Sequence, residues 1–251
     1  MMRYFLKQFV SGKSFLFAVG LLFAFLLSNA WEDIMGQADA LLIFQITSEL
    51  GVAVMLRPIA AALPIAFFLM REWGTRYHTF VLSRSSCGQY AAAKVAAAYI
   101  VGFAVPFSAC LLLLAIAAIL SPASITGLAE SSVRIFPHLL ARGWPFLALL
   151  LYITAFSLAG AIWSVATVGL SMLTTNGYVL VAAPFLLERV LSYILQFFGR
   201  FAPMLLCLDT SQGYAYHISG GVGIQFIYSI FLSTAVFILV FWKIKRRLRH
   251  G

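Results

Sequence analysis

Long apolar runs separated by short polar stretches organise the whole chain. Six such runs occupy residues 14–30, 50–70, 95–120, 143–170, 178–198 and 221–242. A helix of about 20 apolar residues crosses a hydrocarbon core of about 30 Å. Because no water reaches the backbone there, runs of this length are expected to be helices and not barrel strands. The pattern predicts an all-α polytopic membrane protein with six transmembrane helices, in one transmembrane domain that covers residues 1–251.

The stretch from residue 143 to 187 carries no charge and is too long for one crossing. A turn at Thr174-Thr175-Asn176-Gly177 would divide it, because an Asn-Gly pair supports positive φ angles. The first run has a competing interpretation as a cleaved signal sequence, since Ser28-Asn29-Ala30 resembles a cleavage site. We favour a retained first span, because the run is longer than the apolar part of a usual signal sequence.

The segment before the first run has two faces. Met2, Phe5, Leu6 and Phe9 recur on one side, and the polar positions Arg3, Lys7 and Ser11 are spaced four apart on the other. This spacing predicts a short amphipathic helix that lies in the membrane interface. A simple charged flank of the next span would explain the pattern equally well.

Composition excludes a soluble globular protein. The chain is 63% hydrophobic and 10% charged, with a mean hydropathy of +0.98. Its net charge of +9 comes from cations at the ends of apolar runs, where they report topology and not nucleic-acid binding. Of 17 Lys and Arg, 12 fall in segments that would all lie on one side: Arg3, Lys7, Lys13, Arg71, Arg76, Arg84, Lys94, Lys243, Lys245, Arg246, Arg247 and Arg249.

Both termini are therefore expected in the cytoplasm of a multi-pass protein of the cytoplasmic membrane, with a bacterial membrane as the leading choice. The acidic stretch 31–49, with no Lys or Arg, is expected as an outside loop. Residues 121–142 and 199–220 are expected as the other two outside segments.

Three charged residues fall inside predicted spans. Arg57 lies in the second span, at a depth from which its side chain could snorkel to the outer headgroups; a substrate-facing role is the alternative. Glu188 and Arg189 lie near the middle of the fifth span, where ions must find partners or water. They are candidates either for a structural ion pair or for an intramembrane substrate pathway.

No catalytic or metal motif is present. Ser11-Gly12-Lys13-Ser14 lacks the preceding strand and glycine of a phosphate-binding loop, and no HExxH occurs. Cys87, Cys110 and Cys207 have no metal-ligand spacing. We therefore expect no enzyme activity and no bound cofactor in this chain, and any ATP hydrolysis must come from another polypeptide.

The segment 71–94, REWGTRYHTFVLSRSSCGQYAAAK, is the one patterned polar stretch inside the chain. Glu72, Gly74 and Thr75 are followed by Leu82, by the Ser83–Ser86 turn with Arg84, and then by Tyr90 and Lys94. This order resembles the signature of ABC-2 type transporter permeases, and the six spans and amphipathic N-terminus are similar to that family as well.

The resemblance implies a type V exporter-like fold and a cytoplasmic coupling helix that docks in a separate ATPase. The implied coupling residues are Glu72, Trp73, Gly74, Thr75, Arg76, Tyr77, Phe80, Leu82 and Arg84. An ordinary loop with aromatic headgroup anchors would explain Trp73 and Arg76 equally well.

The family further implies the membrane subunit of an ATP-binding cassette exporter for a peptide, drug or lipid-like substrate. It would work as a homodimer, or as a heterodimer with a similar permease, with ATP and Mg²⁺ on two partner ATPases. Spans two and five would line the dimer seam. The alternatives are an ion-gradient secondary transporter that uses Glu188, a non-transporting accessory or immunity subunit, and an intramembrane enzyme.

Overall fold

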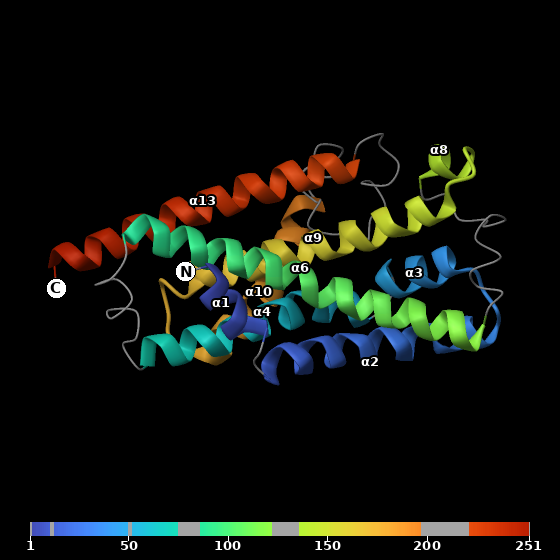
Figure 1. Cartoon of the computed structure of the whole chain (residues 1–251), viewed down its shortest axis with the longest axis horizontal. Coiled ribbons are helices and arrows are strands. Elements are labelled where there is room, and N and C mark those ends of the chain that lie inside the picture. The colour runs from blue at the N-terminus through green and yellow to red at the C-terminus, as the bar shows by residue number, and fades with distance from the viewer. Residues whose placement is uncertain are drawn as a thin grey trace.

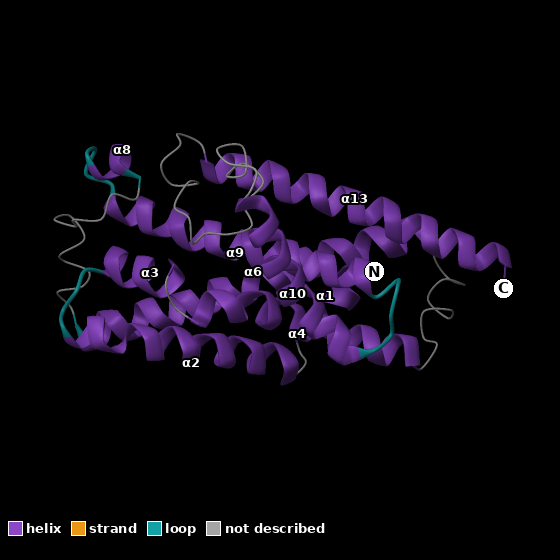
Figure 2. Ribbon diagram, turned by 180° about the vertical axis from the view of Figure 1, so that it is seen from behind, coloured by secondary structure: helices purple, strands orange, loops and turns teal. Residues whose placement is uncertain are grey.

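The computed structural model describes residues 2–10, 13–49, 52–74, 86–121, 136–196 and 221–250. All regular secondary structure in these parts is helical, in an elongated bundle (Figures 1 and 2). The helices are α1 (Met2–Val10), α2 (Lys13–Met35), α3 (Ala40–Glu49), α4 (Val52–Gly74), α6 (Cys87–Leu120), α8 (Pro137–Leu140), α9 (Pro145–Leu170), α10 (Gly177–Gln196) and α13 (Gly221–His250).

Four helical segments in the described parts are long and apolar enough to cross a membrane: Lys13–Met35, Cys87–Leu120, Pro145–Leu170 and Phe226–Arg246. They correspond to the first, third, fourth and sixth predicted spans, and they are consistent with a membrane-embedded protein. Helices α4 and α10 occupy the second and fifth predicted positions. The all-helical prediction is thus confirmed for the described residues, four of the six predicted spans are long and apolar enough to cross, and crossing by α4 and α10 stays a prediction.

Helices α6 and α9 cross at the centre of the bundle. A Cβ atom on Gly102 would lie 2.0 Å from Ser164 Oγ, and one on Gly160 would lie 2.7 Å from the Gly102 carbonyl oxygen. Ser164 Oγ donates a hydrogen bond across the crossing to the carbonyl of Ala98 at 2.6 Å. Small residues let two helix backbones approach this closely, which is how membrane helices gain packing energy without a hydrophobic driving force between them.

The expected loop at residues 31–49 is wrong for most of its length, because this segment is largely helical, while its position outside the membrane stays a prediction. Helix α2 continues to Met35, and α3 begins after a short turn in which Gln37 has a left-handed φ of 57°. Asp39 caps α3 by accepting a hydrogen bond from Leu42 N at 2.9 Å. Leu41 and Phe44 then pack in the core beside α2. The acidic residue marks a helix start rather than an exposed loop.

The predicted turn between α9 and α10 is confirmed, but its chemistry differs from the expectation. Neither Asn176 nor Gly177 has a positive φ. Asn176 instead caps α10, with Oδ1 accepting from Tyr178 N at 3.0 Å and its carbonyl accepting from Leu180 N at 3.0 Å. Asparagine is favoured at this position because it satisfies an amide that the first helical turn leaves open.

Helix α1 is amphipathic, as expected, and its two phenylalanines pack against protein, while its location in the membrane interface stays a prediction. Phe5 and Phe9 are fully buried, while Arg3 and Lys7 are exposed. Phe5 packs edge-on against Tyr90 of α6, with ring centroids 5.7 Å apart. Helix α1 is thus an integral part of the bundle, lying beside α4 and α6 (Figure 1).

Candidate functional site

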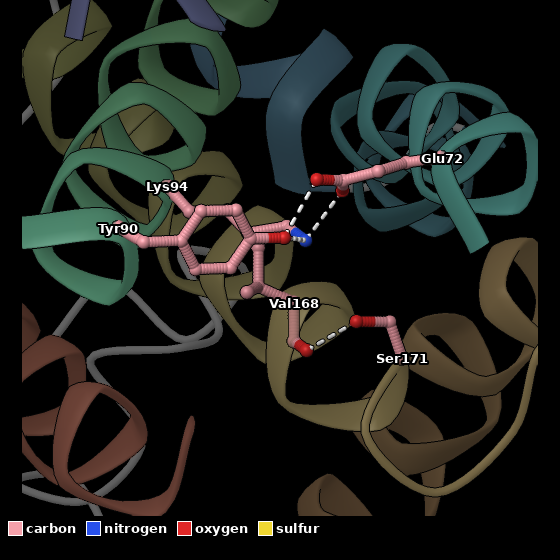
Figure 3. A network of polar contacts seen from close by, with 5 residues as sticks. All are labelled: Glu72, Tyr90, Lys94, Val168 and Ser171. Atoms are coloured by element: carbon pink, nitrogen blue, oxygen red, sulfur yellow. Dashed lines mark hydrogen bonds and ion pairs between the residues drawn. The ribbon is translucent and has the colours of Figure 1, made fainter. Parts of the chain in front are cut away.

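The end of α4 and the first turns of α6 meet at a buried polar cluster of Glu72, Tyr90 and Lys94 (Figure 3). Lys94 Nζ donates to Glu72 Oε2 at 2.6 Å and to the Tyr90 hydroxyl oxygen at 2.7 Å. The Tyr90 hydroxyl donates to Glu72 Oε1 at 2.6 Å. Both carboxylate oxygens of Glu72 therefore accept a bond from α6, and the three residues form a closed ring of hydrogen bonds.

Local sequence places the two α6 residues on one face. Ser86 caps the helix by accepting from Gln89 N at 3.2 Å, so that α6 begins at Cys87. Tyr90 and Lys94 are four residues apart and therefore neighbours on the helix surface. The Lys94 ammonium also lies 4.9 Å from the centre of the Tyr90 ring. The exposed fractions of Glu72, Tyr90 and Lys94 are 3%, 1% and 0%.

Aromatic side chains cover the cluster. Phe5 of α1 contacts Tyr90, and the Phe5 and Phe9 rings lie 6.0 and 4.9 Å from Phe68 of α4, all in edge-on geometry. This cover keeps water away, so each bond in the cluster acts in a low dielectric and an unpaired charge there would be costly. The aromatic cover also explains why α1 packs on the bundle at this point.

The C-terminal end of α9 lies beside the same cluster (Figure 3). Ser171, which ends α9, donates from Oγ to the Val168 carbonyl at 2.7 Å. Val168 belongs to the same buried core as Phe5, Phe9 and Tyr90. Four helices, α1, α4, α6 and α9, are therefore joined at one end of the bundle.

A second buried ion pair joins α4 to α10. Arg57 Nη2 donates to Glu188 Oε1 at 2.9 Å, and both side chains are almost completely buried. The guanidinium carbon of Arg57 lies 4.9 Å from the centre of the Phe156 ring of α9. Burial is tolerable because the charge has a carboxylate partner and an aromatic face.

Arg189 contributes less to this pair. Its Nη2 atom lies 3.7 Å from Glu188 Oε2, and its side chain is 34% exposed. Adjacent helical residues point about 100° apart, so Arg189 cannot share the inner position of Glu188. The prediction that Glu188 finds a partner inside the bundle is confirmed, and that partner is Arg57.

The expected snorkelling of Arg57 is wrong. Its side chain is fully buried and turns inward to Glu188. The carboxylate of Glu188 on α10 competes with the headgroups for the guanidinium and holds it inside the bundle.

The structure also changes the picture of segment 71–94. Glu72 was expected at a docking surface but is buried against α6, because α6 brings a lysine and a tyrosine to it. Trp73 and Gly74 form the end of α4. Thr75, Arg76, Tyr77, Phe80, Leu82 and Arg84 lie outside the described residues.

Sequence reasoning named Tyr90 and Lys94 as parts of a pattern without giving either a structural role. One signal was available in the sequence. Lys94 follows Tyr90 by four residues and stands at the start of a long uncharged run, so burial of this helix would require an acceptor for both side chains. The identity of that acceptor depends on the packing of α4 against α6, which one sequence does not contain.

We expect Glu188→Gln to lower the free energy of unfolding by about 2 kcal/mol, because the amide keeps an oxygen for Arg57 but removes its countercharge. Chemical unfolding of the detergent-solubilised chain would measure this loss. Glu32→Gln is the matched control, since Glu32 is exposed on α2. Equal small losses in both variants would show that the buried pair contributes nothing to stability.

Within the described residues, no group of three or more His, Cys, Asp or Glu side chains could hold a metal ion, and Cys87 and Cys110 are free thiols. The two buried ion pairs fix helices relative to one another, α4 to α6 and α4 to α10. The chain matches no family model, no curated protein and no solved structure.

Proposed function

We propose that this chain is the membrane subunit of an ATP-binding cassette exporter of the ABC-2 type. In this proposal α4 and α10 are the second and fifth of six spans, and both termini are cytoplasmic in a bacterial cytoplasmic membrane. The chain works as a homodimer, or as a heterodimer with a similar permease. ATP and Mg²⁺ bind to two separate ATPase subunits, and this chain carries no catalytic residue or cofactor.

The Glu72, Tyr90 and Lys94 cluster supports this proposal most strongly. These residues are three positions of the permease-like pattern, and they bond to one another although 18 and 22 positions separate Glu72 from its partners. The cluster joins the C-terminal end of α4 to the N-terminal end of α6, the two helix ends that flank residues 75–85. A force applied to that segment by a docked partner would therefore act on α4 and α6 together, which is what a coupling element requires.

The geometry refines which residues would contact the ATPase. Glu72 is buried within the chain, so we assign it the role of holding α4 to α6. The docking role falls to the residues after it: Trp73, Gly74, Thr75, Arg76, Tyr77, Phe80, Leu82 and Arg84. Aromatic and arginine side chains are the groups most often responsible for binding energy at protein interfaces.

Helices α4 and α10 are the candidates for the dimer seam and the transport pathway. Leu186, Val190 and Ile194 follow one face of α10 and are 57%, 52% and 45% exposed. The Arg57–Glu188 pair lies behind this face, between α10 and α4. A second copy packed here would place two such ion pairs beside the seam, where relative movement of the two halves could open and close them.

An ion-gradient transporter with Glu188 as its titrating group is the alternative, together with a non-transporting accessory subunit. The bond from Arg57 gives Glu188 a fixed partner inside the bundle, which favours a structural role for this carboxylate over a carrier role. Transport by the reconstituted chain without any ATPase would support the ion-driven alternative and contradict our proposal.

Co-purification with a candidate ATPase, encoded beside this chain, tests the assignment. We expect Arg76→Ala and Phe80→Ala to weaken the complex by about tenfold each, as loss of an interface hot spot does, and to abolish stimulation of ATP hydrolysis. Arg3→Ala is the control, because Arg3 is exposed on α1. Full complex formation and full ATPase activity in both loop variants would show that the segment is not a coupling element.

A further inference from the structure

An apolar groove with a volume of about 370 Å³ lies between α6 and α13 and is open along one side. Its walls include Val95, Ala96 and Tyr99 of α6 and Ile230 and Phe237 of α13. A cavity of this size is at the small end of the range for ligand pockets. The two helices run antiparallel past one another along it (Figure 1).

Two contacts define the ends of the groove. Tyr99 and Ser229 share a hydrogen bond of 2.7 Å at the end towards the middle of α6. A Cβ atom on Gly88 would lie 3.8 Å from the Phe241 ring, so α6 and α13 also approach each other near the start of α6. The groove is therefore closed at its inner end by a polar contact and leads towards the basic end of α13.

The hydroxyl groups in the walls are already bonded. Ser233 Oγ donates to the Ser229 carbonyl at 2.7 Å, and Thr234 Oγ1 donates to the Ile230 carbonyl at 2.9 Å. The walls consequently offer alkyl and aromatic surface to an occupant, and an occupant does not need to supply hydrogen-bond partners for them. An unbranched hydrocarbon chain fits such a lining.

Aromatic side chains lead from the groove to cations. The Phe237 and Phe241 rings are stacked with centroids 6.2 Å apart, and Lys245 Nζ lies 5.8 Å from the centre of the Phe241 ring. Lys245 and Arg246 are exposed. An occupant that fills the groove would therefore present its polar end to positive charge.

The distance along α13 matches one leaflet. From Ile230 to Lys245 a helix rises about 22 Å. Half of a bilayer hydrocarbon core is about 15 Å, which leaves room for a glycerol and a phosphate before the lysine is reached. We propose that this groove binds one acyl chain of an anionic glycerophospholipid, whose phosphate lies at Lys245. Anionic lipids concentrate at basic segments next to membrane helices.

Native mass spectrometry of the full chain, with dioleoyl phosphatidylglycerol or dioleoyl phosphatidylcholine added, tests this proposal without any ATPase. We expect the anionic lipid to be retained about fivefold better, which is the factor that one cation near the membrane surface supplies. Ala96→Trp, which fills the groove, should lose both lipids. Lys245→Gln should keep lipid binding but lose the preference for phosphatidylglycerol.

Matched controls are available on the same molecule. Ala115→Trp adds the same bulk to an exposed position of α6 outside the groove, and Arg142→Gln removes one exposed charge elsewhere. Equal retention of the two lipids by the native chain, or unchanged retention by Ala96→Trp, would overturn the proposal. A change from dimer to monomer in Ala96→Trp without loss of lipid would also overturn it, because a second copy would then be the occupant.

Discussion

Lys94→Met is expected to lower the free energy of unfolding by about 3–5 kcal/mol, the cost of removing one partner from a buried ion pair. The substitution leaves the Glu72 carboxylate beneath the aromatic cover of Phe5 and Phe9 with the Tyr90 hydroxyl as its one remaining partner in the cluster. Thermal and chemical unfolding in detergent would measure the loss. Glu72→Met should have a comparable effect, because it removes the carboxylate that pairs with the buried lysine.

Replacing the whole cluster separates stability from function. The triple variant Glu72→Met, Tyr90→Phe, Lys94→Met removes both charges and the hydroxyl, and similar buried pairs can be exchanged for apolar residues at little cost. We expect it to regain most of the stability lost in Lys94→Met. If the single variant unfolds like the native chain, the cluster is not a structural joint. If the triple variant stimulates ATP hydrolysis by the proposed partner as the native chain does, hydrogen bonding in the cluster is not needed for force transfer.

Gly102→Ala is expected to destabilise the bundle by about 3 kcal/mol, because overpacking at a close helix crossing forces the backbones apart. The new methyl group would lie 2.3 Å from Ser164 Cβ as well as 2.0 Å from its Oγ, so rotation of the serine hydroxyl cannot relieve the clash. The same unfolding measurements would detect the loss. Size-exclusion chromatography should also show a larger aggregated fraction than for the native chain.

Gly20→Ala is the natural comparison for that variant. Gly20 lies in α2, and a Cβ atom there would meet nothing within 4 Å. Since alanine is favoured over glycine in a helix by up to about 1 kcal/mol, this variant should match or exceed the native stability. A similar loss in Gly20→Ala and Gly102→Ala would contradict the importance of the crossing.

The helices could largely be predicted from hydropathy, because an apolar run in a bilayer has few alternatives to a helix. Helix α3 escaped prediction because Glu32, Asp33 and Asp39 were interpreted as signs of an exposed loop. In the structure Asp39 caps the start of α3. Acidic side chains perform this local role in packed segments as readily as in exposed loops.

The site could be predicted only in part. The cost of a buried charge required a partner for Glu188, and the sequence therefore indicated the presence of an ion pair. The choice of Arg57 required the relative placement of α4 and α10, and the burial of Glu72 required that of α4 and α6. Contacts between distant segments arise from tertiary packing, which periodicity in one sequence does not encode.

The position of Gly102 along α6 gives that helix the mechanics of a lever. Helix α6 is continuous over 34 residues, and its length is about 51 Å. The crossing with α9 lies about 22 Å from Cys87 and about 27 Å from Leu120, so it divides the helix almost in half. A tilt about this fulcrum would move the two ends by similar distances in opposite directions. A push of a few ångströms on the cluster end would thus swing the far end the other way, and any bending of the helix would be concentrated at Pro106, one turn beyond the crossing.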